Sequence, residues 1–179
     1  MRVKIIAVLL LISLALTGNA QIKEFNLTVD PADFQYIYDN YEQDNYVPAT
    51  FSYNGTTWAD VSIRIRGDGS RVYPKKSLKI RFNQGEYIDG RVSLNLNAEW
   101  EDQTYIQQSL ASILMQASGQ VCFKTEHVRL SLNGNFLGLY LLIEAVDEHF
   151  LAARGMNTLG YTYKAALDAS SLSVFDVPA

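Results

Sequence analysis

The stretch HVRLSLNGNFLGLYLLI, residues 127–143, decides the fold of this chain. Strand-forming residues flank Asn133-Gly134 on both sides, and an Asn-Gly pair between two such runs is typical of the tight turn of a β-hairpin. We therefore expect two antiparallel strands, one over residues 127–132 and one over residues 136–143.

The region upstream of this hairpin repeats the pattern. Asn54-Gly55 again lies between two apolar runs, which predicts a second hairpin. In residues 61–66 apolar and polar side chains alternate strictly, so Val61, Ile63 and Ile65 are expected to face a core. Further strands are expected over residues 22–29, 49–53, 58–65, 78–82, 92–96 and 159–165.

Helical spacing appears between these strands. Asp30-Pro31 is typical of a helix cap followed by proline at the first helical position, and an aromatic face follows it. Residues 102–118 show a longer helical pattern closed by Gly119, and we expect this helix to pack on the sheet through Ile106, Leu110 and Leu114. A short helix is expected near residues 150–154. The order of elements indicates an α+β fold, mainly an antiparallel sheet with packed helices.

The first 20 residues have the order of a secretory signal peptide. Arg2 and Lys4 precede an apolar run over residues 5–16, and the small residues Gly18 and Ala20 follow it. The alternative is an uncleaved membrane anchor, which needs about 20 apolar residues. We therefore expect an exported protein, in the extracellular space, periplasm or secretory pathway, with one domain over residues 21–179 and no stable membrane span after cleavage.

The composition limits which partners and which kinds of site are expected. The net charge is -4 with both signs interspersed, which does not favour nucleic acid as a partner. Cys122 is the only cysteine, so no intrachain disulfide can form, and its apolar neighbours predict burial. His127 and His149 lack cysteine or carboxylate neighbours at metal-ligand spacing, so a structural zinc site is not expected.

One group of residues suggests phosphate chemistry. A glycine-containing turn over residues 67–70 joins two expected strands, and Lys75, Lys76 and Lys79 follow it. A glycine turn brings backbone N–H groups close to a polyphosphate, a lysine neutralises it, and a carboxylate such as Glu144 holds the lysine. The simpler alternative is a turn that uses glycine for its backbone conformation and lysines that only face solvent. Arg66-Gly67-Asp68 also spells an adhesion tripeptide, a short string that often arises by chance.

Four segments together resemble the CotH kinase family. They are RIRGDGSR (64–71) with PKKSLKI (74–80), LNLNA (94–98) with the helix behind it, VRLSLNGNFLGLYLLIEAVD (128–147), and YK (163–164). Order and spacing fit over about residues 60–165. Two departures occur: Asp68-Gly69 stands where the family usually has Asn-Ser, and Gln107-Gln108 stands where Arg-Asn is common.

The resemblance implies an atypical protein-kinase-like domain that uses ATP and Mg²⁺ to phosphorylate exported or coat proteins. It also implies a set of ATP-binding or phosphate-binding candidates, among which the phosphate-contacting lysine stays open: Arg66, Gly67, Gly69, Ser70, Lys76, Lys79 and Glu144, with Lys75 as a further possible lysine.

The catalytic and metal-binding aspartates of the family lie downstream of the YK segment. Asp168 and Asp176 occur there without a context that matches, so no catalytic or metal-binding residue is assigned. The chain is expected to be the front part of a CotH-type domain, inactive alone, whose partner is an exported substrate or a chain covering the missing half. The alternative is a non-catalytic binding or coat-assembly module on the same scaffold.

Overall fold

The computed structural model describes residues 22–83, 88–159, 162–165 and 172–175. The expected signal peptide, Asp168 and Asp176 lie outside the described residues. The elements are, in chain order, β1 (Lys23–Thr28), α2 (Pro31–Asp39), β2 (Val47–Tyr53), β3 (Thr56–Arg66), the 3₁₀ helix η1 (Gly69–Val72), β4 (Ser77–Phe82), β5 (Ser93–Asn97), α3 (Gln107–Ala117), β6 (Thr125–Leu132), β7 (Asn135–Ile143), α4 (Glu148–Ala152), β8 (Thr162–Ala165) and β9 (Leu172–Phe175).

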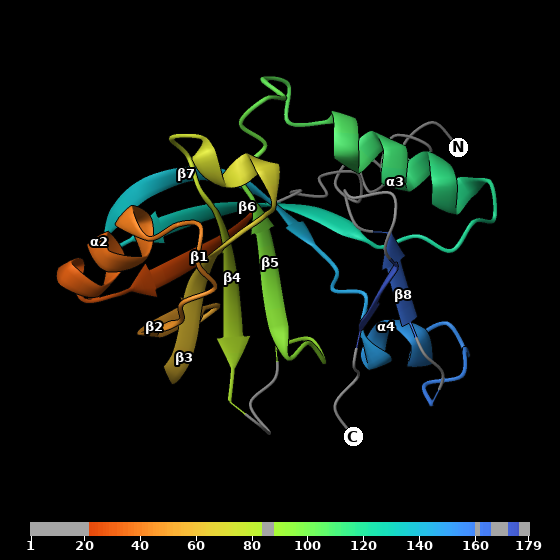
Figure 1. Ribbon diagram of the computed structural model, residues 1–179, viewed down its shortest axis with the longest axis horizontal. Coiled ribbons are helices and arrows are strands. Elements are labelled where there is room, and N and C mark those ends of the chain that lie inside the picture. Colours follow the sequence, from red (N-terminus) through yellow and green to blue (C-terminus); the bar gives the residue numbers. More distant parts are fainter. Residues whose placement is uncertain (1–21, 84–87, 160–161, 166–171, 176–179) are drawn as a thin grey trace, which may run out of the picture.

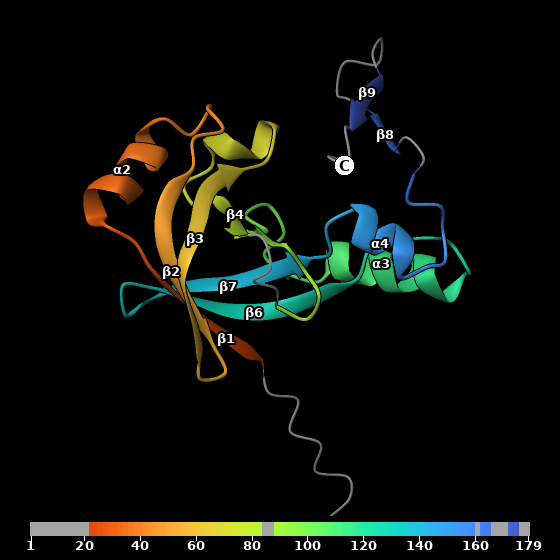
Figure 2. The same cartoon turned by 90° about the horizontal axis from the view of Figure 1, so that it is seen from below.

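Seven of the strands form a closed barrel in the order β1-β2-β3-β4-β5-β7-β6. All neighbours pair antiparallel except β1 and β6, which run parallel and close the barrel. Helix α2 lies on one side of the barrel, and α3 and α4 lie on the opposite side (Figures 1 and 2). The expected α+β class with a mainly antiparallel sheet is confirmed. The last expected strand is β8, which pairs with β9 in a separate two-stranded sheet.

Both Asn-Gly turns are confirmed. Asn133 and Gly134 have φ angles of 50° and 80°, and Asn54 and Gly55 have 49° and 78°. Positive φ at both central residues is the type I′ geometry that matches the twist of the flanking strands. The Asn133 side chain does more than turn the chain, because its amide bonds both the N–H and the C=O of Val29, at 2.9 and 3.0 Å. The β6–β7 turn is thereby tied to the end of β1.

The inside of the barrel holds the core that the alternation predicted. Val61, Ile63 and Ile65 are buried, and so are Leu78 and Ile80 on the neighbouring strand. An aromatic cluster fills the same space, with ring centroids 5.1 to 5.7 Å apart: Phe25, Phe51, Tyr53, Trp58 and Phe82.

Helix α2 also follows its prediction. The Asp30 carboxylate accepts hydrogen bonds from the Ala32 and Asp33 amides at 2.8 and 3.4 Å, and Pro31 occupies the first helical position. Ile37 is buried against the barrel, with Phe34 and Tyr41 partly buried beside the core. The buried state expected for Cys122 is confirmed as well.

The predicted packing of the long helix is wrong. Helix α3 is shorter than expected, and Ile106, Leu110 and Leu114 are 53, 50 and 59 % exposed. The side of α3 that meets the barrel is polar: Ser112 is its buried residue, and the Ser112 hydroxyl donates a hydrogen bond to the Phe123 carbonyl. Polar groups on the outer barrel surface attract the polar side of the helix, so its apolar side faces outward. Gly119, with φ of 80°, follows the helix end as expected.

Within the described ranges, the structure contains no helix long and apolar enough to cross a lipid bilayer.

Comparing an exposed leucine on α3 with a buried leucine in the barrel tests this arrangement directly. Leu110→Ala should lower the free energy of unfolding by less than about 1 kcal/mol, because a half-exposed side chain leaves no cavity. Leu94→Ala removes the same atoms from a residue that is 1 % exposed, and it should cost about 2–5 kcal/mol. Urea denaturation of both variants measures the difference, and equal losses would show that α3 packs on the core.

Candidate functional site

A cationic row crosses the outer surface of the barrel. In the sheet register Arg64 on β3 lies opposite Lys79 on β4, which in turn lies opposite Asn95 on β5. Their neighbours Ile63, Ile80 and Leu94 point into the core, so the alternation of strands turns the row outward. Arg66 and Arg81, two positions along β3 and β4, share this surface.

Lys79 is the least neutralised member of the row. Burial lowers the pKa of its ammonium, and repulsion from Arg64, Arg66 and Arg81 lowers it further, whereas Asp147 provides an opposing attraction. Within the described residues Lys79 has neither a hydrogen bond nor an ion pair. A positive group held among three arginines is an environment that favours an anion.

Two of these arginines, Arg64 and Arg66, are positioned by polar partners of their own. Arg64 pairs with the Asp44 carboxylate at 2.7 Å. Arg66 donates to the side-chain oxygen of Asn97, and the Asn97 amide donates to Gln108 on α3 at 3.0 Å. Burial, with repulsion from Arg64, lowers the pKa of Arg66 to about 10. The position of Arg66 is therefore coupled to α3 through Asn97.

Lys75 has a structural role. Its ammonium donates to the carbonyl of Ala98 at 2.8 Å and to the carbonyl of Leu139. It also lies over the rings of Tyr140 and Tyr105, at 4.3 and 4.8 Å. Burial lowers the pKa of this lysine to about 8. Lys75 thus fastens the loop after β5 to β7 and has little capacity left for a ligand.

Lys76 is equally occupied. It is 7 % exposed, and its ammonium donates to the Arg71 carbonyl. The rings of Tyr41 and Tyr38 lie 4.1 and 5.0 Å from it. Of the three lysines that the sequence left open, only Lys79 has its charge available.

The glycine turn lies at the end of β3, beside Arg66. Gly67 has φ of 115°, while Gly69 begins η1 without a positive φ. Arg71 holds the turn by donating to the Gly67 carbonyl and by pairing with Asp44 at 2.6 Å. Gly69 and Ser70 are exposed, so their backbone and hydroxyl groups are accessible next to the row.

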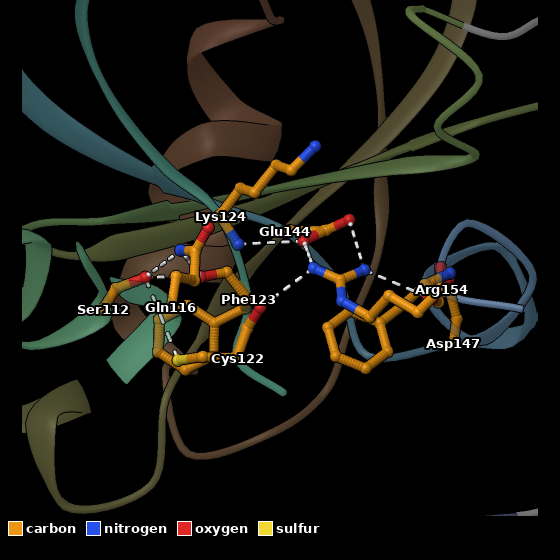
Figure 3. Close-up of polar contacts among 9 residues, drawn as sticks. Ser112, Gln116, Cys122, Phe123, Lys124, Glu144, Asp147 and Arg154 are labelled. Atoms are coloured by element: carbon orange, nitrogen blue, oxygen red, sulfur yellow. Dashed lines mark hydrogen bonds and ion pairs between the residues drawn. The ribbon is translucent and has the colours of Figure 1, made fainter. Parts of the chain in front are cut away.

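Glu144 does not hold any of the three lysines. It pairs with Arg154 at 2.7 Å and accepts a hydrogen bond from the Lys124 amide at 2.8 Å (Figure 3). Burial acts to raise the pKa of this carboxyl, but the Arg154 and Lys124 contacts outweigh it and the pKa is lowered. Arg154 also donates to the Cys122 carbonyl at 2.9 Å. We call Glu144 and Arg154 the α4 clamp, since they fix α4 to the ends of β6 and β7.

Sequence reasoning missed several residues of this surface and of the α4 clamp: Arg64, Arg81, Asn95, Asn97, Asp147 and Arg154. The strict alternation of residues 61–66 contained a usable signal, because it puts Arg64 and Arg66 on one face. Asp147 caps α4 through the Phe150 amide at 3.1 Å and supplies the carboxylate that attracts Lys79.

The donor set of the site suits phosphate oxygens. Guanidinium and ammonium groups bind phosphates, guanidinium in a bidentate manner. The site is less suited to Mg²⁺, because the described residues contain no group of three His, Cys, Asp or Glu side chains arranged for a metal. Carboxylates for Mg²⁺ would have to come from elsewhere.

The sequence profile of the family described as CotH kinase protein matches residues 63–177. The chain belongs to the CotH kinase family. The family match includes the cationic row, the glycine turn and the α4 clamp. The inner spore coat protein H of Bacillus subtilis (strain 168) is 32% identical over 130 residues. The aligned part makes up 73% of this chain but only 36% of that relative.

Removing the charge of the α4 clamp should destabilise the fold in a pH-dependent manner. Glu144→Gln should lower the free energy of unfolding by about 1–3 kcal/mol at pH 7, because Arg154 loses a charged partner. The pKa of Glu144 is lower in the folded state, so its contribution is present above about 4.3, the unfolded value, and is lost as the pH falls through the folded pKa.

Thermal unfolding of both proteins from pH 7 to pH 3 measures this difference, which should shrink at the acid end. Glu24→Gln is a matched control, since Glu24 is 68% exposed and its pairing with Arg129 is long, at 3.4 Å. An equal effect of the two substitutions would contradict a structural role for the clamp.

Proposed function

We propose that this chain supplies the phosphate-binding half of an exported CotH-type, ATP-dependent protein kinase. The observation that carries the proposal is the state of Lys79, a partly buried ammonium beside three arginines with no ion pair in the described part of the chain. This arrangement is unfavourable alone and becomes favourable when an anion neutralises it.

A polyphosphate matches the spacing of the cations in the site as well as their charge. Arg64 and Lys79 lie opposite each other on adjacent strands, and strands lie about 4.8 Å apart. Two successive phosphate groups of a nucleotide can therefore meet these two side chains. The exposed backbone of Gly69 and the Ser70 hydroxyl extend the same surface with further donors.

ATP would supply the phosphoryl group, and this chain's residues would bind and orient its phosphates. Phosphoryl transfer also needs a carboxylate-held Mg²⁺ and a group that positions the acceptor. The described residues do not offer that carboxylate set. We therefore expect the described residues to bind phosphate, and phosphoryl transfer to require catalytic aspartates from outside the described residues.

A second candidate function is a non-catalytic binding or coat-assembly module. It is favoured by the exposed apolar side of α3, which suits a protein contact, and by the name of the relative, an inner spore coat protein. In either case the partner is an exported protein or a chain that completes the domain. The two functions differ in what they require of Lys79, which only phosphate binding uses.

The three lysines should respond differently to substitution. Lys79→Met should weaken ATP or tripolyphosphate binding by at least about tenfold without loss of stability, because one charge-assisted contact is removed. Lys76→Met should instead lower the melting temperature, since its ammonium is buried in structural contacts. Isothermal titration calorimetry and thermal unfolding measure the two effects.

Lys124→Met is the matched control, because Lys124 is exposed and its side chain lies outside the row. Equal ATP affinity of Lys79→Met and the wild-type chain would exclude the proposed site. Transfer of labelled phosphate by the wild-type chain alone, lost on Asp168→Ala or Asp176→Ala, would show that the catalytic carboxylates belong to this chain.

Export gives a separate prediction. Because the apolar run ends in small residues before the polar Gln21, the mature chain should begin at or near Gln21. Mass spectrometry of the protein recovered from its native host measures the N-terminus, and a product that still carries residues 1–20 would contradict cleavage.

A further inference from the structure

Helix α3 is oriented with its apolar side away from the protein. We call this side the outer face of α3, and it consists of four large apolar residues that are each at least half exposed: Ile106, Leu110, Ile113 and Leu114. An amphipathic helix of a globular protein normally turns such a stripe toward the core. Figure 1 shows α3 at the periphery of the molecule, with this helix beyond the end of the barrel.

The attachment of α3 to the barrel is made of polar contacts. Ser112 donates to the Phe123 carbonyl, and the Gln116 amide donates to the same carbonyl at 3.1 Å (Figure 3). The Asn97 amide donates to Gln108 at 3.0 Å. These contacts fix the orientation of the helix, so its apolar stripe faces outward because of specific hydrogen bonds.

An 11-residue helix needs apolar burial to be stable. The inner side of α3 is held by polar contacts, and the four residues of the outer face remain 50 to 59% exposed. A partner that covers the outer face would supply what is missing. The question is which kind of partner suits the chemistry of this face.

The charge pattern favours a second copy of the same chain. No charged residue occurs between Asp102 and Lys124, so the whole of α3 and both of its flanks are neutral. When two identical surfaces meet about a two-fold axis, a charged residue near the axis lies close to the same residue of the other copy. A neutral helix avoids the like-charge repulsion that this symmetry otherwise creates. A partner selected by opposite charge would find no complementary charge here.

The exposed area is also sufficient. With the flanking Met115 and Val121, which are 52% and 61% exposed, the patch offers on the order of 600 Å² per copy. Two copies would bury on the order of 1,200 Å², the lower end of specific protein interfaces. We propose that the chain forms a two-fold dimer through the outer face of α3. The inference does not depend on phosphate binding.

The test is the oligomeric state of the full chain, as processed by its host, measured by sedimentation equilibrium over a range of concentrations. The wild-type chain should show a monomer–dimer equilibrium. Leu110→Glu should weaken the dimer by at least about tenfold, since two carboxylates are then buried near each other. Phe136→Gln is the matched control, because Phe136 is 56% exposed and lies on the β6–β7 hairpin, outside α3. This substitution should leave the equilibrium unchanged.

Two further measurements distinguish a lost dimer contact from a general loss of folding. Mixing Leu110→Glu with Leu110→Lys should restore a dimer that neither forms alone, which a general loss of folding would not allow. In the wild-type chain the amides of residues 107–117 should exchange with solvent more slowly as the concentration rises. A monomer throughout, a dimer unaffected by Leu110→Glu, concentration-independent exchange, or a stoichiometric foreign protein on α3 would each overturn the proposal.

Discussion

The closure of the barrel is the constraint on which the rest of this structure depends. One pair of parallel strands, β1 and β6, joins the two ends of an otherwise antiparallel sheet. The closure is fastened where the Asn133 amide bonds both backbone groups of Val29. A closed barrel has no free strand edges, and it gives each strand one inner and one outer surface. The inner surface forms the hydrophobic core, so a binding site of this chain has to lie on the outer surface or in the loops.

That division explains the character of the candidate site. The same alternation that buries Ile63 and Ile80 brings Arg64 and Lys79 together on the outside. Concentrating cations in this way costs stability, and the cost is offset only in part by Asp44 and Asn97. The loops use the other two lysines for structure, with Lys75 and Lys76 each surrounded by carbonyls and aromatic rings. The geometry of their contacts distinguishes Lys79 from the other two lysines.

Much of the fold could be predicted from the sequence, because its signals are local. Alternation in residues 61–66, the Asn133-Gly134 turn and the Asp30 cap each act over a few residues. The orientation of α3 could not be predicted, since periodicity shows which side of a helix is apolar but not what lies opposite it. The partner of Glu144 was likewise hidden, because the attraction to Arg154 depends on how α4 folds back. The choice among three lysines required knowing which carbonyl groups pack around each ammonium.

The Asn97 side chain connects the cationic row on the barrel to helix α3. Its side-chain oxygen accepts from Arg66, while its amide nitrogen donates to Gln108 on α3. A ligand that fixes the guanidinium of Arg66 would therefore act on Asn97, a side chain that also contacts the helix. Linkage requires any such coupling free energy to be the same in both directions. Any coupling between an anion beside Arg66 and a partner on α3 would have to pass through this single amide.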